Sequence, residues 1–213
     1  MAAQPYSALS KRKKLPTVIV MRHGETYLDD GVNKFASTLE QGLDNTGLEE
    51  ALYAAHEMAA MGPIVAIYSS GVKRAEETAE IIAEECDAPV TTADLLNPWE
   101  LGEVTGMDEE DGHPILVKYA TNMPYKPLPG SDESYNQWVD RFMEGLEFYV
   151  LGPTIESGGP CVLVSNSLNI KLIQAWLAGD NEEIDPELAM EQNELEGGDW
   201  FAIEYDGMKW RMA

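Results

Sequence analysis

The sequence predicts an α/β fold, a three-layer αβα sandwich in which a mostly parallel central sheet is covered by helices on both faces. Two observations predict this architecture. Short β-branched runs alternate with longer helical patterns from Thr17 onward, and no internal repeat or long linker divides the chain. The 213 residues, 44% of them apolar, are enough for one domain with a sizeable core. We therefore expect one domain over residues 17–213, preceded by a basic arm over residues 1–16.

Alternating strand and helix patterns account for the first half of this domain. The run Val18–Met21 is typical of a buried strand. After it, Asp44–Thr46 offers N-cap residues for a helix whose apolar positions follow helical spacing and stop before Gly62. The other elements expected in this half are a strand at 64–68, a helix over about 72–85 and a short strand near 90–91.

The second half begins with a segment rich in proline and glycine, residues 97–131, which we expect to be irregular and to form a lid. Regular patterns then resume. The expected elements are a helix over 134–149, a strand at 161–164, a helix over 168–177, and a hairpin of 200–205 with 209–212 around an Asp206-Gly207 turn.

Charge and hydropathy exclude several classes of function. Thirty-eight acidic residues against 14 basic ones give a formal net charge of -24, so a nucleic-acid backbone or an anionic membrane surface would be repelled by most of the exterior. No apolar run approaches the roughly 18 residues of a membrane span, and no secretory signal is recognisable. The two cysteines, Cys86 and Cys161, have no metal-ligand spacing and are typical of buried thiols in a reducing compartment. We expect a cytoplasmic protein that binds neither nucleic acid nor membrane.

The expected basic arm contrasts with this acidity, because residues 1–16 contain no acid and include Lys11-Arg12-Lys13-Lys14. A solvated arm or one that contacts another copy of the chain is one interpretation, so a homo-oligomer is compatible with the sequence. A nuclear signal or a polyanion contact is the other.

Three loops that follow predicted strands carry the residues most suited to chemistry. They are 22–26, 69–74 and 165–167, and in a parallel sheet they meet at one edge. His23 and Arg22 follow the first strand, and Arg74 opens the helix after the second. Two of only five arginines, together with helix N-terminal amides, form a pocket for a dianion. A histidine nucleophile in such a pocket suits phosphoryl transfer.

The motifs around these residues resemble those of the histidine phosphatase superfamily, also called phosphoglycerate mutase-like. Five segments follow the family's order and spacing over about residues 17–210. They are Val20–Thr26 with its Arg-His-Gly-Glu-Thr signature, Leu43–Ala51, Ile67–Ala79, Leu96–Gly106, and Pro129–Ser134 with Arg141. The resemblance implies the phosphoglycerate mutase-like αβα fold.

Site roles are implied by the same resemblance. His23 would be the phospho-accepting nucleophile, and Arg22 and Arg74 would hold the phosphoryl oxygens. An asparagine often completes the family's pocket a few residues after the signature; here Asn33 would substitute for it after a small loop insertion. No group of His, Cys and carboxylate residues has metal-ligand spacing, so we expect no metal and no cofactor.

Two positions depart from the family pattern. The second catalytic histidine is replaced by Asn166, which can donate a neutral hydrogen bond but cannot carry a charge. The glutamate that acts as general acid is replaced by Pro98. Glu100 is the nearest carboxylate in a similar segment and is our candidate acid. The alternatives left open are Glu103, Asp132 and Glu133.

The leading hypothesis is a phosphomonoesterase that acts on a small phosphorylated substrate through a phosphohistidine and is impaired by Asn166. A mutase fits less well, because the chain leaves little room for long insertions and its charge disfavours bisphosphates. The alternative hypothesis is a weak or inactive phosphatase-like module used for binding or assembly. The sequence does not distinguish a natural Asn166 from an introduced one, and it does not name the substrate.

Overall fold

A six-stranded sheet in the order β3-β2-β4-β1-β5-β6 forms the centre of the computed structural model, which describes residues 15–27, 41–192 and 195–213. The neighbouring pairs β1 with β4, β4 with β2, and β2 with β3 are parallel, whereas β5 runs antiparallel to β1 and forms a hairpin with β6. The strands are β1 (Thr17–Arg22), β2 (Ala66–Ser70), β3 (Val90–Ala93), β4 (Pro160–Ser165), β5 (Trp200–Tyr205) and β6 (Trp210–Met212).

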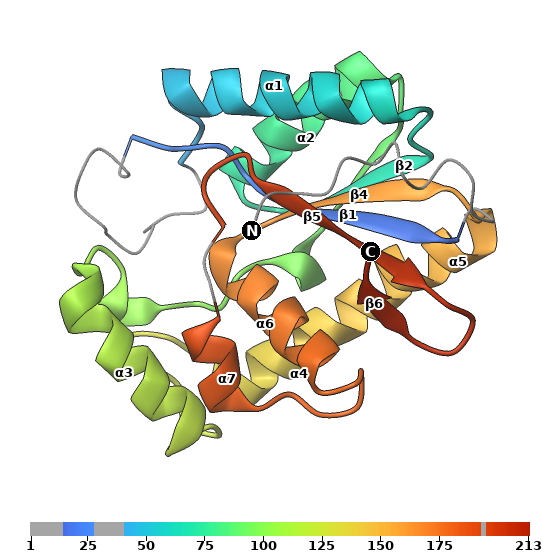
Figure 1. The fold of residues 1–213 in the computed structure, drawn as a ribbon. Coiled ribbons are helices and arrows are strands. Elements are labelled where there is room, and N and C mark those ends of the chain that lie inside the picture. Colours follow the sequence, from blue (N-terminus) through green and yellow to red (C-terminus); the bar gives the residue numbers. More distant parts are fainter. Residues whose placement is uncertain (1–14, 28–40, 193–194) are drawn as a thin grey trace.

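Helices cover both faces of this sheet (Figure 1). One layer holds α1 (Asn45–Met61) and α2 (Lys73–Cys86). The other holds α4 (Tyr135–Gly145), which continues through a π-helical segment, η4 (Leu146–Leu151), into α5 (Gly152–Ser157), together with α6 (Ser167–Ala178) and α7 (Pro186–Glu191). The three-layer αβα sandwich with a mostly parallel sheet is thereby confirmed.

Alternation along the buried strands explains the two layers. Successive side chains of a strand point to opposite faces, and all of Val18–Met21 are buried. Val18 and Val20 belong to the core beneath α4 and α6, whereas Ile19 and Met21 belong to the core beneath α1 and α2. A strand that is apolar on both faces therefore requires a helical layer on each side.

Helix α1 begins where the sequence predicts. Asp44 is its N-cap, and the Asp44 carboxylate accepts a hydrogen bond from the Gly47 backbone N–H at 2.8 Å. This bond satisfies one of the four N–H groups that have no partner within the helix. Residue Gly62 ends the helix with a φ of 126°, a conformation that favours glycine.

The expectation of an irregular segment over 97–131 is wrong for part of its length. It contains the helix α3 (Glu109–Thr121) in addition to a short 3-10 turn, η3 (Gly102–Val104). Gly112 and Pro114 disfavour a helix locally. Pro114 nevertheless lies inside α3, and burial of Leu116 and Tyr119 stabilises the helix. The sequence also did not predict α7, and β2 begins two residues later than the expected residue 64.

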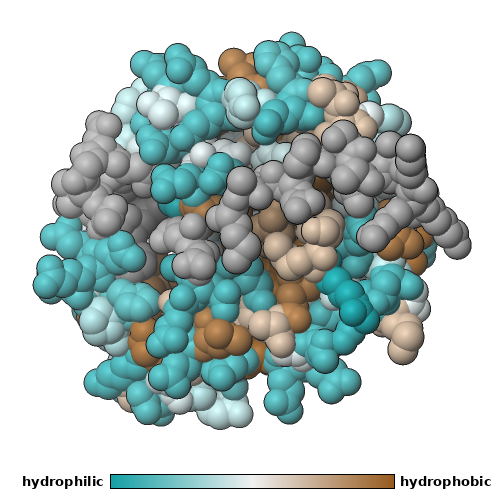
Figure 2. Space-filling model, in the orientation of Figure 1, coloured by the Kyte–Doolittle hydropathy of each residue, from teal (hydrophilic) through white to brown (hydrophobic). Residues whose placement is uncertain are grey.

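The surface matches the acidic composition. Hydrophilic side chains cover most of the described face in Figure 2, and apolar ones form small separate patches. Within the described ranges, no helix has the length and apolarity needed to cross a bilayer. Cys161 is buried as expected, whereas Cys86 is only half-buried. Residues 1–14, most of the expected basic arm, lie outside the described residues.

Candidate active site

The carboxyl ends of β1, β2 and β4 lie at one edge of the sheet, as the sequence predicts. Parallel register pairs Arg22 at the end of β1 with Ser165 at the end of β4. The backbone N–H of His23 extends this ladder by donating to the Ser165 carbonyl at 3.1 Å. Strand β2 ends at Ser70, one strand further along. The three predicted loops therefore meet around His23.

The histidine at this edge is held in one tautomer. Its Nδ1 lies 2.8 Å from the Gly24 carbonyl oxygen, which can only accept, so Nδ1 carries the proton. The other nitrogen, Nε2, accepts a hydrogen bond from Arg74 Nε at 2.9 Å. The lone pair of Nε2 therefore points toward the guanidinium of Arg74. An anion bound by that guanidinium would lie next to the unprotonated nitrogen.

Electrostatics favour the neutral form of His23. Its side chain is almost completely buried, with 5% exposed. Desolvation lowers the pKa of His23 well below 6.5, and the nearby cations Arg74 and Arg22 lower it further, against the Gly24 carbonyl, which raises it. A neutral imidazole keeps a lone pair available for attack at physiological pH.

Arg74 links His23 to Asn166, the residue at the start of α6. Its Nη2 donates to Asn166 Oδ1 at 3.1 Å, and Asn166 Nδ2 donates to Ser70 Oγ at 3.1 Å. Arg74 and Asn166 are each 4% exposed. Residues from α2, β2 and the β4–α6 junction thus form one buried network beside His23. Arg22 is half-buried, and its Nη1 donates to the Leu195 carbonyl at 2.6 Å.

Two glycines allow the turn after His23 to pack against the start of α1. A Cβ atom added to Gly24 would lie 2.4 Å from the Gly47 carbonyl oxygen, and one added to Gly47 would lie 2.1 Å from the Glu25 carbonyl oxygen. Both contacts involve backbone atoms, which cannot rotate away. Thr78 supports the same turn, because its hydroxyl accepts from the Gly24 N–H at 3.2 Å and donates to the Arg74 carbonyl at 2.8 Å.

The candidate general acid lies apart from this network. Glu100 is exposed, and its Oε2 accepts from Ser131 Oγ at 3.0 Å and from the Asp132 N–H at 3.2 Å. Among the described residues, no hydrogen bond joins Glu100 to the His23 network. Of the alternatives, Glu103 and Asp132 are also exposed, and Glu133 forms an ion pair with Arg141 at 2.7 Å. The role of Glu100 stays a prediction.

Asn33 lies outside the described residues, so its placement in the phosphate pocket also stays a prediction. Within the described ranges, no group of His, Cys, Asp and Glu side chains is arranged to hold a metal ion.

Sequence reasoning missed three polar residues that support the site. Thr78 lies four residues after Arg74, and this spacing places both on the same face of the predicted helix, so the sequence could have indicated Thr78. Ser70 lies in a predicted loop but was not singled out. Asn169 is fully buried in α6, and only its occurrence inside an apolar helix could have marked it.

Comparison with known proteins identifies relatives along most of the chain. The chain is 30% identical over 135 residues to a metal-independent phosphoserine phosphatase of Arabidopsis thaliana. It is 30% identical over 170 residues, 75% of the chain and 80% of the relative, to a 2,3-bisphosphoglycerate-dependent phosphoglycerate mutase of Parvibaculum lavamentivorans. It is 28% identical over 168 residues, 76% of the chain and 74% of the relative, to a glucosyl-3-phosphoglycerate phosphatase of Mycolicibacterium vanbaalenii.

Coverage differs among these relatives. The match to the phosphoserine phosphatase spans 61% of this chain and 56% of that protein, and a match to a phosphoglycerate mutase-like protein of the same plant spans 58% of its length. The chain therefore spans little more than half of these two relatives.

Solved structures of the same fold align over nearly the whole chain. A mycobacterial glucosyl-3-phosphoglycerate phosphatase in complex with VO3 has a TM-score of 0.73 at 21% identity, covering 92% of this chain and 96% of that one. A protein described as a putative alpha-ribazole-5'-P phosphatase of Escherichia coli has a TM-score of 0.70 at 20% identity, with coverages of 92% and 94%. The family model of the histidine phosphatase superfamily (branch 1) matches residues 18–213. This match shows that the chain belongs to the histidine phosphatase superfamily.

Proposed function

We propose that the chain is a phosphomonoesterase of the histidine phosphatase type. His23 Nε2 attacks the phosphorus atom, an N–P bond forms, and the ester P–O bond breaks. The leaving oxygen takes a proton from a carboxylic acid, for which Glu100 is the candidate. Water then attacks phosphorus and gives a proton back to the same carboxylate, the N–P bond breaks, and inorganic phosphate leaves with neutral His23 and the carboxylic acid restored. The chain and water supply every group that these steps use.

The observation that carries this proposal is the hydrogen bonding of His23. Nδ1 is bonded to the Gly24 carbonyl, and Nε2 faces Arg74 at 2.9 Å. The Gly24 bond fixes the ring orientation and leaves the proton on the nitrogen away from the substrate. When Nε2 becomes phosphorylated, a positive charge develops on the ring. The Gly24 carbonyl oxygen stabilises this charge because it accepts the hydrogen bond from Nδ1.

Phosphate recognition in this proposal rests on Arg74 and Arg22. In the structure Arg74 donates from Nε to His23 and from Nη2 to Asn166. Two oxygens of one phosphoryl group match this fork and would replace both acceptors, which also frees the lone pair of His23 Nε2. Asn33 is a candidate for a further contact. We propose a small phosphorylated molecule as substrate, with the 97–131 segment over the pocket as its lid.

Named relatives support hydrolysis as the outcome. Of the four relatives described above, two are phosphatases, one is a mutase and one is described as phosphoglycerate mutase-like. The net charge of -24 disfavours the highly anionic bisphosphates that a mutase of that kind uses. The same charge is the basis for proposing that nucleic acids are not partners. A cytoplasmic location fits the family and stays part of the proposal.

Asn166 is expected to impair turnover without preventing phosphate binding. Its Oδ1 accepts from Arg74 and its Nδ2 donates one hydrogen to Ser70. The amide has a second hydrogen, which we expect to donate to a phosphoryl oxygen. A histidine there would supply a charged donor as negative charge shifts in the transition state, which strengthens the stabilisation.

One observation favours a second candidate function, a phosphate-binding or assembly module with little turnover. The exposed carboxylate of Glu100, the candidate acid, is already bonded to Ser131 and Asp132, and the sequence resemblance implies a proline, Pro98, at the family's acid position. A site that binds phosphate through Arg22 and Arg74 but cannot protonate a leaving group would hold its ligand without converting it.

Restoring the histidine separates the two candidates. If the rest of the pocket is competent, Asn166→His raises kcat/KM on a phosphomonoester panel by about 10² to 10³, the effect of one preorganised donor. Asn166→Ala serves as the matched control and should be no better than the unsubstituted protein. An Asn166→His protein that folds and binds phosphate but hydrolyses nothing would favour the module over the phosphatase.

A further inference from the structure

Five successive backbone carbonyls of the segment Asp94–Pro98 accept hydrogen bonds from two side chains on the helical layer that contains α4 and α6. This segment begins with a short 3-10 helix, η2 (Asp94–Leu96), and leads to Glu100. Arg141 on α4 donates to four of the carbonyls, and Asn169 on α6 donates to the fifth, that of Leu96, at 2.9 Å. The Arg141 bonds go to Asp94 (3.3 Å), Leu95 (2.9 Å), Asn97 (3.0 Å) and Pro98 (3.2 Å).

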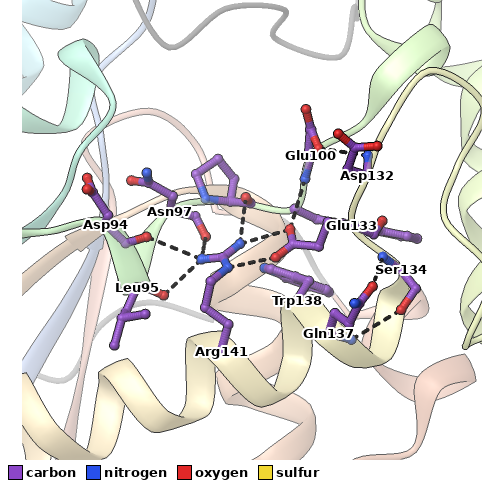
Figure 3. Close-up of polar contacts among 12 residues, drawn as sticks. Asp94, Leu95, Asn97, Glu100, Asp132, Glu133, Ser134, Gln137, Trp138 and Arg141 are labelled. Atoms are coloured by element: carbon purple, nitrogen blue, oxygen red, sulfur yellow. Dashed lines mark hydrogen bonds and ion pairs between the residues drawn. The ribbon is translucent and has the colours of Figure 1, made fainter.

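Arg141 is itself fixed by a carboxylate on the neighbouring loop. Glu133 accepts from Arg141 Nε at 2.7 Å and from Nη2 at 2.9 Å, a two-point contact. In Figure 3 the guanidinium lies in a ring of carbonyl oxygens on one side and the Glu133 carboxylate on the other. The backbone N–H of Glu100 also points to Glu133, at 3.4 Å. Arg141 thus holds the segment before Glu100 directly and contacts Glu100 itself through Glu133.

Asn169 connects the same segment to the nucleophile. Its side chain is fully buried, and its hydrogen-bonding capacity is used on three neighbours. Nδ2 donates to the Leu96 carbonyl and to Ser165 Oγ at 3.2 Å, and Oδ1 accepts from Trp138 Nε1 at 3.1 Å. The Ser165 carbonyl accepts the His23 N–H at 3.1 Å. A continuous chain of bonds therefore runs from Leu96 to the backbone of His23.

A third contact ties the segment to the phosphate-binding helix. Asn97 Oδ1 accepts from the Gly71 N–H at 2.6 Å, just before α2, whose first turn carries Arg74. The segment is therefore fixed relative to both His23 and Arg74. Asparagine is a poor residue for a helix interior, and Nε, Nη1 and Nη2 of Arg141 all donate to protein acceptors. Both residues instead determine where this segment lies.

We propose that Arg141 and Asn169 are positioning residues that hold Asp94–Pro98 so that Glu100 can protonate the leaving oxygen of the substrate. The inference rests on the proposed function. It predicts a loss that depends on the leaving group. An alkoxide must be protonated as it leaves, whereas nitrophenolate departs without a proton, so only alkyl phosphates need a positioned acid.

The test compares glycerol 2-phosphate with p-nitrophenyl phosphate. Arg141→Lys, Asn169→Ala and Glu100→Gln are measured beside two controls, Arg211→Lys and Asn122→Ala, which alter exposed residues of the same types. We expect kcat/KM for the alkyl substrate to fall by about 10-fold or more in the three test variants, up to the roughly 10² to 10⁴ that a general acid contributes. We expect kcat/KM for the aryl substrate to change by less than about threefold. The controls should change neither.

Each outcome decides between positioning and a merely structural role. Equal losses on both substrates, or no loss on either, would overturn the proposal. Should Asn169→Ala not fold, Arg141→Lys, which retains the charge, gives the deciding ratio. Hydrolysis of the aryl phosphate alone by the unsubstituted protein would remove the positioning role and leave transfer to His23 intact. Absence of a phosphohistidine in the unsubstituted protein would overturn both proposals.

Discussion

Replacing Arg74 with lysine tests the proposal that the Arg74 guanidinium binds phosphate. The substitution keeps the positive charge but removes the fork, because one ammonium group cannot occupy the places of both Nε and Nη2. A phosphate that bonds to both nitrogens loses at least one charged hydrogen bond, which stabilises binding by about 1.5–3 kcal/mol. The dissociation constant for phosphate or vanadate should therefore rise by about 10- to 150-fold.

Calorimetry on the folded variant measures this change directly. Arg211→Lys is the matched control, because Arg211 lies on β6 and forms an exposed ion pair with Asp206. The control should bind phosphate with unchanged affinity. An unchanged affinity in Arg74→Lys, with the control also unchanged, would refute the assignment of Arg74 as the phosphoryl ligand.

Two further predictions concern stability. Because the pKa of His23 is lowered below 6.5 in the folded protein, the unfolded chain binds the extra proton as pH falls below 6.5. Neutral His23 therefore makes its full contribution to the free energy of unfolding above pH 6.5. That contribution is lost as the pH falls from 6.5 toward the pKa of His23 in the folded protein. Urea unfolding should show a smaller loss of stability between about pH 7.5 and 5.5 in His23→Gln than in the unsubstituted protein or in exposed His56→Gln, by up to about 1.4 kcal/mol. Equal losses in all three proteins would contradict the burial of a neutral His23. Gly47→Ala should lower the free energy of unfolding by about 1–3 kcal/mol, because its Cβ would overlap the Glu25 carbonyl, whereas exposed Glu49→Ala should change it little. A Gly47→Ala protein as stable as its parent would show that the turn can shift.

The convergence of His23, Arg74 and Asn166 could be predicted from the sequence, because each lies just after a strand in a parallel arrangement. Sheet geometry alone places such positions at one edge. The hydrogen bonds among them needed the structure, since Arg74 reaches both His23 and Asn166 across 51 and 92 residues of chain.

Helix α3 and the contacts of Asn169 could not be predicted, because both depend on residues far away in the sequence. Gly112 and Pro114 disfavour a helix locally, and tertiary burial of Leu116 and Tyr119 outweighs that preference. Asn169 meets partners 31 and 73 residues away, at Trp138 and Leu96. Local patterns carry no information about such pairings.

The acid candidate shows the limit of motif spacing. Spacing along the chain favours Glu100, which lies two residues after Pro98, the position that the resemblance implies for the acid. The structure gives Glu100 an exposed position bonded to Ser131 and Asp132. The carboxylate that transfers the proton must lie close to the leaving oxygen in the folded protein. The number of residues between two positions in the sequence does not determine that distance.

Transfer of a phosphoryl group to His23 is the most direct test of the account. Incubation with an activated aryl phosphate should label the protein with an acid-labile, base-stable adduct on His23. His23→Ala should abolish the label, and His56→Ala, which alters an exposed histidine on α1, should retain it. An acid-stable label on a serine, or a label that survives in His23→Ala, would contradict a histidine nucleophile.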